Sequence, residues 1–336
     1  MLWVRTAALT VKGGHMATTA GLDLEPSALP RRIRQLRWRT WRGVLVRAGK
    51  GFVKDNCSDW AASLTYYTVL ALFPSAIVVV ALVNLVSQGD RTVDTVVGLL
   101  RDMGASSVVN KPGVVDAIRA VVEQKSAAGV LLSFGLLTAI WSASGYVGGF
   151  TRASNAVYGV EEGRPFWKLR PLQIALTVAG LLLLAIVAVM LIVSGSVTTA
   201  LGERLGLGEA PRLAWTVAKW PLLVAIAMLL LAMLFWIAPN VRQPKFRWLT
   251  VGGFVALLAT GLASFGFGLY VANFDSYDKT YGSLGAVIAF LVWVYLVNSA
   301  ILFGVEVNAE VQRGRELQAG ADKVEDPVLP PRTPAE

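Results

Sequence analysis

The sequence contains little charge, one cysteine and one histidine. Only 16% of its 336 residues are Asp, Glu, Lys or Arg, against roughly 25% in an ordinary soluble domain. A single cysteine, Cys57, excludes an intramolecular disulfide framework and a cysteine-based metal site. Nothing beside Cys57 marks it as a nucleophile, so we interpret it as a small helix residue near the membrane interface.

Catalytic motifs are also missing. The one histidine, His15, lies in the N-terminal segment, and the sequence has no HExxH, GxSxG or GxxxxGK pattern. Phosphodiester cleavage needs clustered acids that hold metal ions, or a histidine base. We therefore expect no enzymatic activity, no metal and no cofactor, and the lack of a P-loop excludes an intrinsic ATP drive.

Long uncharged runs dominate what is present. Six windows carry no Asp, Glu, Lys or Arg: 60–89, 126–151, 171–202, 220–241, 248–274 and 280–305. Each exceeds the roughly 20 residues that a helix needs to cross the hydrocarbon core. The sequence predicts an all-α polytopic membrane protein with six transmembrane helices, at about 62–87, 128–151, 172–201, 217–239, 249–273 and 282–306.

Basic residues set the predicted orientation. Before the first span stand Arg31, Arg32, Arg34, Arg37, Arg39, Arg42, Arg47, Lys50 and Lys54. With this segment inside, the inside connections hold twice as many Lys and Arg residues as the outside loops. We expect a protein of the bacterial inner membrane with both termini in the cytoplasm. The net charge of +9 then reflects topology and contact with anionic lipid headgroups, not nucleic-acid binding.

The rest of the chain divides by composition. We expect a disordered leader over 1–29, with Met1 and Met16 both candidate starts, and a basic cytoplasmic or interfacial helix over 30–58. The membrane domain covers 59–315, and its first outer loop, 90–125, is predicted to hold two short amphipathic helices. The Pro-rich tail, 316–336, is predicted to be disordered.

Polar residues at membrane depth are the candidate site. Glu306 ends the last uncharged run, and helical periodicity places Tyr295, Ser299 and Arg313 on its side of the helix. An ionisable group in hydrocarbon costs at least about 2.5 kcal/mol and usually faces protein or water. Glu306 therefore either snorkels or pairs at the cytoplasmic interface, or lines a hydrated cavity as a substrate or proton site.

A second polar stripe enters the first span. Asp55, Asp59, Ser63 and Tyr67 recur every fourth residue. The acids either stabilise a helix start, where the dipole favours negative charge, or face Glu306 across a polar cavity between the first and sixth spans.

Three further features concern the backbone and its packing. Pro74 is predicted to kink the first span or free a carbonyl. Gly145 and Gly149 have the spacing that lets helices approach closely, more often for packing than for function. Gly282 permits close backbone contact before the last span.

Three stretches resemble the YihY/BrkB family of bacterial inner-membrane proteins: "AASLTYYTVLALFPS" (61–75), "NAVYGVEEGRPFWKLR" (155–170) and "YGSLGAVIAFLVWVYLVNSAILFGVEVNAE" (281–310). The resemblance implies a six-helix membrane protein linked to envelope integrity, with a role in moving lipids or other envelope components. It places motif positions at Tyr66, Tyr67, Pro74, Asn155, Tyr158, Gly282, Glu306 and Asn308.

Two functions remain open at this point. Polar stripes in several spans, with a covered outer loop, favour a protein that moves or handles a lipid or other envelope component. Small-residue packing motifs and the basic N-terminal segment favour a scaffold that holds partners at the envelope without transport. The two differ in whether Glu306 and Tyr67 face water.

Overall fold

The uncharged runs form long helices in the computed structural model, which describes residues 36–86, 97–98, 113, 115–116, 128–192, 209–243, 246, 249–272, 283–319 and 329–335. Seven helices are named within this part of the chain: α1 (Trp38–Lys54), α2 (Cys57–Val86), α6 (Ala128–Tyr158), α7 (Phe166–Ile192), α9 (Glu209–Ile237), α10 (Val251–Ala272) and α12 (Ser283–Gln318). The predicted all-α class is confirmed.

Four stretches of the described residues are long and apolar enough to cross a membrane: Phe166–Leu191, Val217–Ile237, Val251–Val271 and Val287–Gln318. They correspond to the third to sixth predicted spans. The first and second predicted spans coincide with α2 and α6, but many of the side chains there lie outside the described residues. Six spans therefore remain a prediction.

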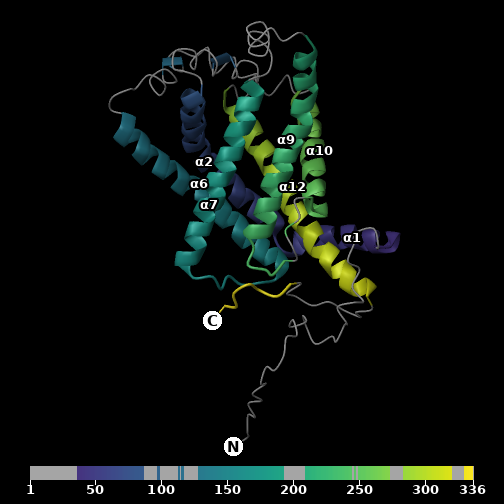
Figure 1. Cartoon of the computed structure of the whole chain (residues 1–336). Coiled ribbons are helices and arrows are strands. Elements are labelled where there is room, and N and C mark those ends of the chain that lie inside the picture. Colours follow the sequence, from purple (N-terminus) through teal and green to yellow (C-terminus); the bar gives the residue numbers. More distant parts are fainter. Residues whose placement is uncertain are drawn as a thin grey trace, which may run out of the picture.

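Helix α12 is the central element. It packs against α10, α1, α2 and α6, and Figure 1 shows it crossing the bundle obliquely from the middle to the lower right. Its 36 residues correspond to about 54 Å of helix, whereas the hydrocarbon core is about 30 Å thick. More than two fifths of α12 therefore extends beyond the length that a membrane requires.

The core joins six of the described helices, α2, α6, α7, α9, α10 and α12, by side chains from widely separated parts of the chain. Leu64 of α2, Phe150 of α6, Phe235 of α9 and Leu302 of α12 are buried in one cluster. The rings of Phe150 and Phe235 stack with their centroids 5.9 Å apart. The opposite faces of α7, α9 and α10 carry exposed large apolar residues, as expected for surfaces in contact with lipid.

Backbone contact between α10 and α12 requires glycine at two positions. A Cβ atom at Gly252 would collide with the carbonyl oxygen of Gly304, and one at Gly304 would lie 2.7 Å from the Cβ of Ala256. Asn308, one turn after Gly304, accepts a 2.8 Å hydrogen bond from the amide of Gly252 through its Oδ1 atom. The predicted motif residue Asn308 thus caps the start of α10.

Helix α1 lies nearly horizontal across the lower part of α12, whereas α7, α9 and α10 stand nearly upright (Figure 1). Its buried residues, Val44 and Ala48, pack on Val307 and Val311 of α12. The chain leaves α1 through Asn56, whose φ of 51° is left-handed. Asn tolerates this conformation better than most residues, and α2 begins at the next position.

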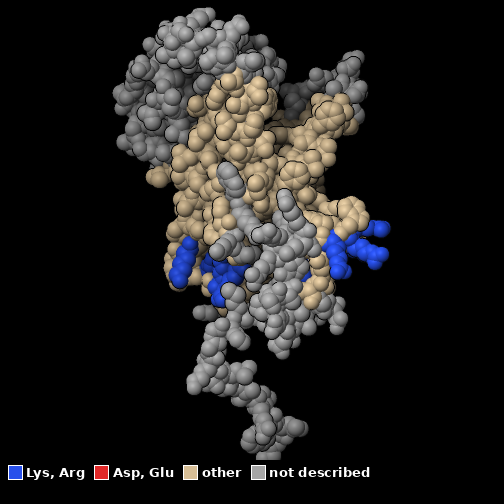
Figure 2. All heavy atoms as spheres, turned by 45° about the vertical axis from the view of Figure 1, so that its right-hand side comes forward, with Lys and Arg blue, Asp and Glu red and all other residues tan. Residues whose placement is uncertain are grey.

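Basic residues gather at the same end of the bundle as α1. On the face shown in Figure 2, Lys and Arg side chains lie at one level near the bottom, and the described surface above them shows no charge. We call this the basic end; it comprises α1, residues 159–165 between α6 and α7, and the final turns of α9 and α12.

One predicted boundary is wrong. The tail was expected to be disordered from residue 316, but α12 continues to Gln318, and residues 329–335 form hydrogen bonds at the basic end. Hydrogen bonds from the Arg37 amide and the Thr40 hydroxyl to Gln318 hold this end of α12 against the start of α1. The leader, Gly282 and nearly all of the loop 90–125 lie outside the described residues. Pro74 lies within α2, but its side chain is not described.

We predict that Gly304→Ala destabilises the protein, because the added methyl would overlap the backbone of α10. Overpacking of this kind costs about 1 to 3 kcal/mol, so the melting temperature in detergent, followed by circular dichroism, should fall.

Gly261→Ala is the matched control on α10. No atom lies within 4 Å of the added Cβ position there, and alanine favours a helix over glycine. The proposed contact would be contradicted if both variants melted at the temperature of the wild type.

Candidate functional site

Three helices meet at the Glu306 carboxylate. Glu306, on α12, is only 2% exposed, and its Oε1 atom accepts a hydrogen bond from the Cys57 thiol at 3.4 Å. Gly51 of α1 lies directly against it, because a Cβ atom at that position would be 2.6 Å from Oε2. The absence of a side chain at Gly51 therefore lets α1 cover the carboxylate.

The charges around Glu306 are mainly acidic. Asp55 and Glu310 both interact electrostatically with it, and so does Tyr158, at the end of α6. Among the residues that the structure describes, no Lys or Arg forms an ion pair with Glu306. A buried carboxylate without a cation is costly unless it binds a proton or another positive group.

Glu310, one turn further along α12, is in the opposite situation. Its carboxylate accepts a hydrogen bond from the Nε atom of Arg47 at 2.6 Å and another from the NH1 atom of Arg313 at 2.5 Å. Arg313, which the helical pattern placed on the side of Glu306, thus pairs with Glu310. The bond from Arg47 fixes α1 to α12, the bond from Arg313 lies within α12, and Thr40 of α1 adds a 2.9 Å hydrogen bond to Gln318.

A buried amide side chain, that of Asn298, lies about two turns before Glu306 in α12. Asn298 donates to the Thr65 hydroxyl of α2 at 3.3 Å and accepts from the Tyr146 hydroxyl of α6 at 3.0 Å. The sequence analysis did not include this group. The signal was available, since Asn298 is the only amide in the uncharged run 280–305.

The structure divides the stripe predicted at the start of the first span: Asp55 lies beside Glu306, whereas Tyr67 faces α6. The Tyr67 ring lies 3.1 Å from the Cβ positions of both Gly145 and Gly149, and its hydroxyl accepts a hydrogen bond from Arg152 at 3.2 Å. Asp59 is exposed in the first turn of α2, and Ser63 is half-buried. Within the described part of the chain, neither of them nor Tyr67 hydrogen-bonds to Glu306.

The remaining predicted residues on α12 lie close to the core. Tyr295 is half-buried and packs against it, and the Ser299 hydroxyl donates to the Tyr295 carbonyl at 2.8 Å. The structure therefore brings Glu306 together with Cys57, Gly51 and the end of α6, and it directs Tyr295 and Ser299 into local packing.

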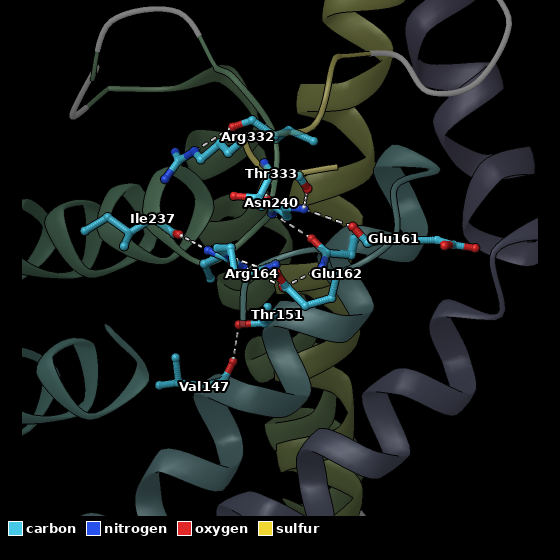
Figure 3. A network of polar contacts seen from close by, with 12 residues as sticks. Val147, Thr151, Glu161, Glu162, Arg164, Ile237, Asn240, Arg332 and Thr333 are labelled. Carbon is cyan, nitrogen blue, oxygen red and sulfur yellow. Dashed lines mark hydrogen bonds and ion pairs between the residues drawn. The ribbon is translucent and has the colours of Figure 1, made fainter. Parts of the chain in front are cut away.

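A second polar network joins the loop 159–165 to the end of α9 (Figure 3). Asn155 accepts from the backbone amide of Asn240 at 2.7 Å and donates to Glu162 at 3.0 Å. The Glu162 carboxylate accepts two hydrogen bonds of 2.7 Å from the guanidinium of Arg164. Arg164 also donates to the carbonyl of Ala238 at 2.7 Å, and thereby satisfies a carbonyl that the end of α9 leaves free.

This network changes the titration of Glu162. Burial alone would raise the pKa of the Glu162 carboxyl, but its hydrogen bonds and charge interaction with Arg164, with a further bond from Asn155, hold the pKa below the ordinary value of 4.5. Among the described residues, no group of three or more His, Cys, Asp or Glu side chains could hold a metal ion. The basic end thus has two polar centres, one at Glu306 and one at Glu162.

We predict opposite effects on stability for two neighbouring acids of α12. Glu310→Gln removes the charge that Arg47 and Arg313 share, and should lower the melting temperature in detergent by several degrees. Glu306→Gln keeps the shape and removes a buried charge that has no cation partner among the described residues, so the melting temperature should stay the same or rise. An equal loss in both variants would contradict this account of Glu306.

We predict a pH-dependent contribution from Glu162. Its pKa is lower in the folded protein than in the unfolded chain, so its stabilisation is complete above pH 4.5 and is lost as the pH falls through the lowered pKa. The difference in melting temperature between wild type and Glu162→Gln should therefore shrink below pH 4.5. Glu161→Gln, at the adjacent exposed position, is the control. A difference that stayed constant with pH would contradict the ion pair.

Comparison with known proteins places these residues in a family. The family model described as Virulence factor BrkB matches residues 48–327. The chain is 27% identical over 259 residues to the ribonuclease-like protein YfkH of Bacillus subtilis, covering 76% of this chain and 90% of that protein. It is 30% identical over 285 residues to a UPF0761 membrane protein of Rhodospirillum centenum, covering 83% of this chain and 60% of that protein.

Another UPF0761 membrane protein, from Alkalilimnicola ehrlichii, is 29% identical over 312 residues, which are 86% of this chain and 64% of that protein. The chain thus spans less than two thirds of these two longer relatives. No solved structure matches. The matched region contains Glu306, Cys57 and the network of Glu162, and it covers most of the sequence. This integral membrane protein belongs to the Virulence factor BrkB family.

Proposed function

We propose that the protein moves or handles a lipid or another envelope component in the bacterial inner membrane, with Glu306 as its interior polar site. In this proposal both termini lie in the cytoplasm, and the basic end faces inward. The protein acts as a carrier and not as an enzyme, so the ribonuclease-like name of YfkH does not extend to this chain.

The observation that carries the proposal is the buried state of Glu306. A carboxylate that is 2% exposed, lies beside Asp55 and Glu310 and lacks an ion pair among the described residues is expensive to keep inside a membrane protein. Such residues commonly mark ion, proton or substrate pathways. A proton or a cationic headgroup would relieve the cost, so ion-coupled movement suits this site.

Helix α1 supports a role for lipid at the same place. Trp38, Leu45, Val46 and Val53 of α1 are exposed apolar residues, and the helix also carries basic side chains. This combination is typical of a helix that lies in the membrane interface and attracts anionic headgroups. Because Gly51 of α1 lies against Glu306 of α12, the helix that makes the proposed lipid contact also covers the interior site.

A scaffold without transport is the second candidate. It is favoured by Tyr67, which packs into the space left by Gly145 and Gly149 and is not directed toward Glu306. In that case the buried polar groups serve only to fix the positions of the helices.

Purified protein in liposomes distinguishes the two candidates. We predict that protein in vesicles of phosphatidylethanolamine and phosphatidylglycerol moves a fluorescent phospholipid between leaflets, as measured by quenching of the outer leaflet with dithionite. Glu306→Gln should slow the movement about tenfold, which corresponds to about 1.4 kcal/mol in the barrier.

Glu316→Gln is the control, because Glu316 is also a buried acid of α12 and its hydrogen bond to Gln312 is compatible with an amide. Movement no faster than in protein-free vesicles would favour the scaffold. Equal rates for wild type and Glu306→Gln would remove Glu306 from the pathway.

A further inference from the structure

The end of the chain occupies a groove at the basic end. Residues 329–335, which we call the C-terminal strap, run beneath the lower ends of the helices (yellow in Figure 1). The groove is formed by the loop 159–165 and by residues 236–242 at the end of α9. The strap lies beyond the region that the family model matches, 48–327, whereas the groove lies within it.

The strap binds first through its backbone. Arg242 donates its amide to the carbonyl of Pro330 at 2.8 Å, and Arg332 donates its amide to the carbonyl of Asn240 at 2.9 Å. Val241 and Pro331 form the antiparallel bridge between these bonds. This pairing resembles the addition of a short strand, a common mode of peptide recognition.

The side chain of Asn240 completes the backbone recognition. Asn240 is fully buried. Its Nδ2 atom donates to the carbonyl of Thr333 at 2.7 Å and to that of Glu161 at 3.0 Å, and its Oδ1 atom accepts from the amide of Thr333 at 3.1 Å. Figure 3 shows Asn240 between the strap and the loop. One amide side chain thus connects the strap to the groove.

Arg332 supplies the specific side-chain contact. Its Nε atom donates to the carbonyl of Val241 at 2.8 Å and its NH2 atom to that of Trp236 at 2.5 Å. The guanidinium also lies 5.1 Å from the centroid of the Trp236 ring. Carbonyls at a helix end attract cations, and the planar fork of Arg can serve two of them at once.

Arg332 also carries a cost that favours release. Burial and the nearby charge of Arg164 lower its pKa, because both disfavour a second positive charge at the end of α9. Arg164 already satisfies the Ala238 carbonyl. The contacts that hold the strap are therefore specific but partly opposed by charge.

The shape of the groove requires glycine and suits proline. A Cβ atom at Gly163 would collide with the carbonyl group of Pro334. Pro330, Pro331 and Pro334 have no amide hydrogen to satisfy and restrict the strap to extended conformations. This restriction lowers the entropy lost on binding.

We propose that this groove is a binding site for an extended peptide that contains proline and arginine, and that the strap is its built-in, releasable ligand. The docked strap holds the loop after α6 against the end of α9. Its release exposes Asn240 and the carbonyls of α9. This inference does not depend on the proposed movement of lipid.

A peptide of residues 329–336 tests the proposal on the full chain. Arg332→Ala weakens the strap but leaves the groove intact, so this variant should bind the labelled peptide at least about tenfold more tightly than wild type, whose own strap competes at a high effective concentration. The same peptide carrying R332A should bind neither protein.

Gly163→Ala, added to the Arg332→Ala protein, should abolish peptide binding, and Gly49→Ala should not, since no atom lies within 4 Å of its Cβ position. Peptide binding that is undetectable in folded Arg332→Ala protein, or unaffected by Gly163→Ala, would overturn the proposal.

Hydrogen exchange of the wild-type protein gives a second test that needs no variant. The amides of Arg332 and Thr333 should exchange more slowly than in the free peptide but faster than those within α9, and excess peptide should accelerate them. Exchange as fast as in the free peptide would show that the strap is not docked. Exchange as slow as in α9, unchanged by peptide, would show that it is not releasable.

Discussion

The close approach of α10 and α12 is the constraint on which the basic end depends. Gly252 and Gly304 bring the two backbones into contact, and Asn308 fixes the start of α10 against the same turn of α12. Glu306 and Glu310 lie on this stretch of α12, between that contact and the docking surface of α1. Any change in the position of α12 therefore moves both acids relative to Cys57 and Arg47.

The helices could be predicted from the sequence, because an uncharged run of more than 20 residues has few stable alternatives to a membrane helix. Which side of each helix packs against protein and which contacts lipid could not be predicted. Lipid and protein interior are both apolar, so apolar periodicity does not distinguish them. Tyr67 was therefore assigned to the side of Glu306, whereas Cys57 and Thr65, on a different face of α2, make the contacts with α12.

The strap was missed for a related reason. Its composition, rich in proline and small residues, indicates disorder when considered by itself. Its stability comes from groups that belong to another part of the chain, namely the Trp236 and Val241 carbonyls and the Asn240 side chain. Glu306 could be identified because a single charge at the edge of an apolar run is conspicuous. Its burial could not be predicted, because it depends on Gly51 of α1, which is distant in sequence but adjacent in space.

The arrangement of α1 has a mechanical consequence. In the proposed placement, its exposed Trp38 and Val53 side chains rest on the bilayer surface, while Gly51 lies directly against Glu306 without an intervening side chain. The helix is also attached to α12 through the ion pair of Arg47 with Glu310. Thinning or stretching of the bilayer would pull on α1 and loosen the cover of the carboxylate, so membrane tension would control the access of water to it.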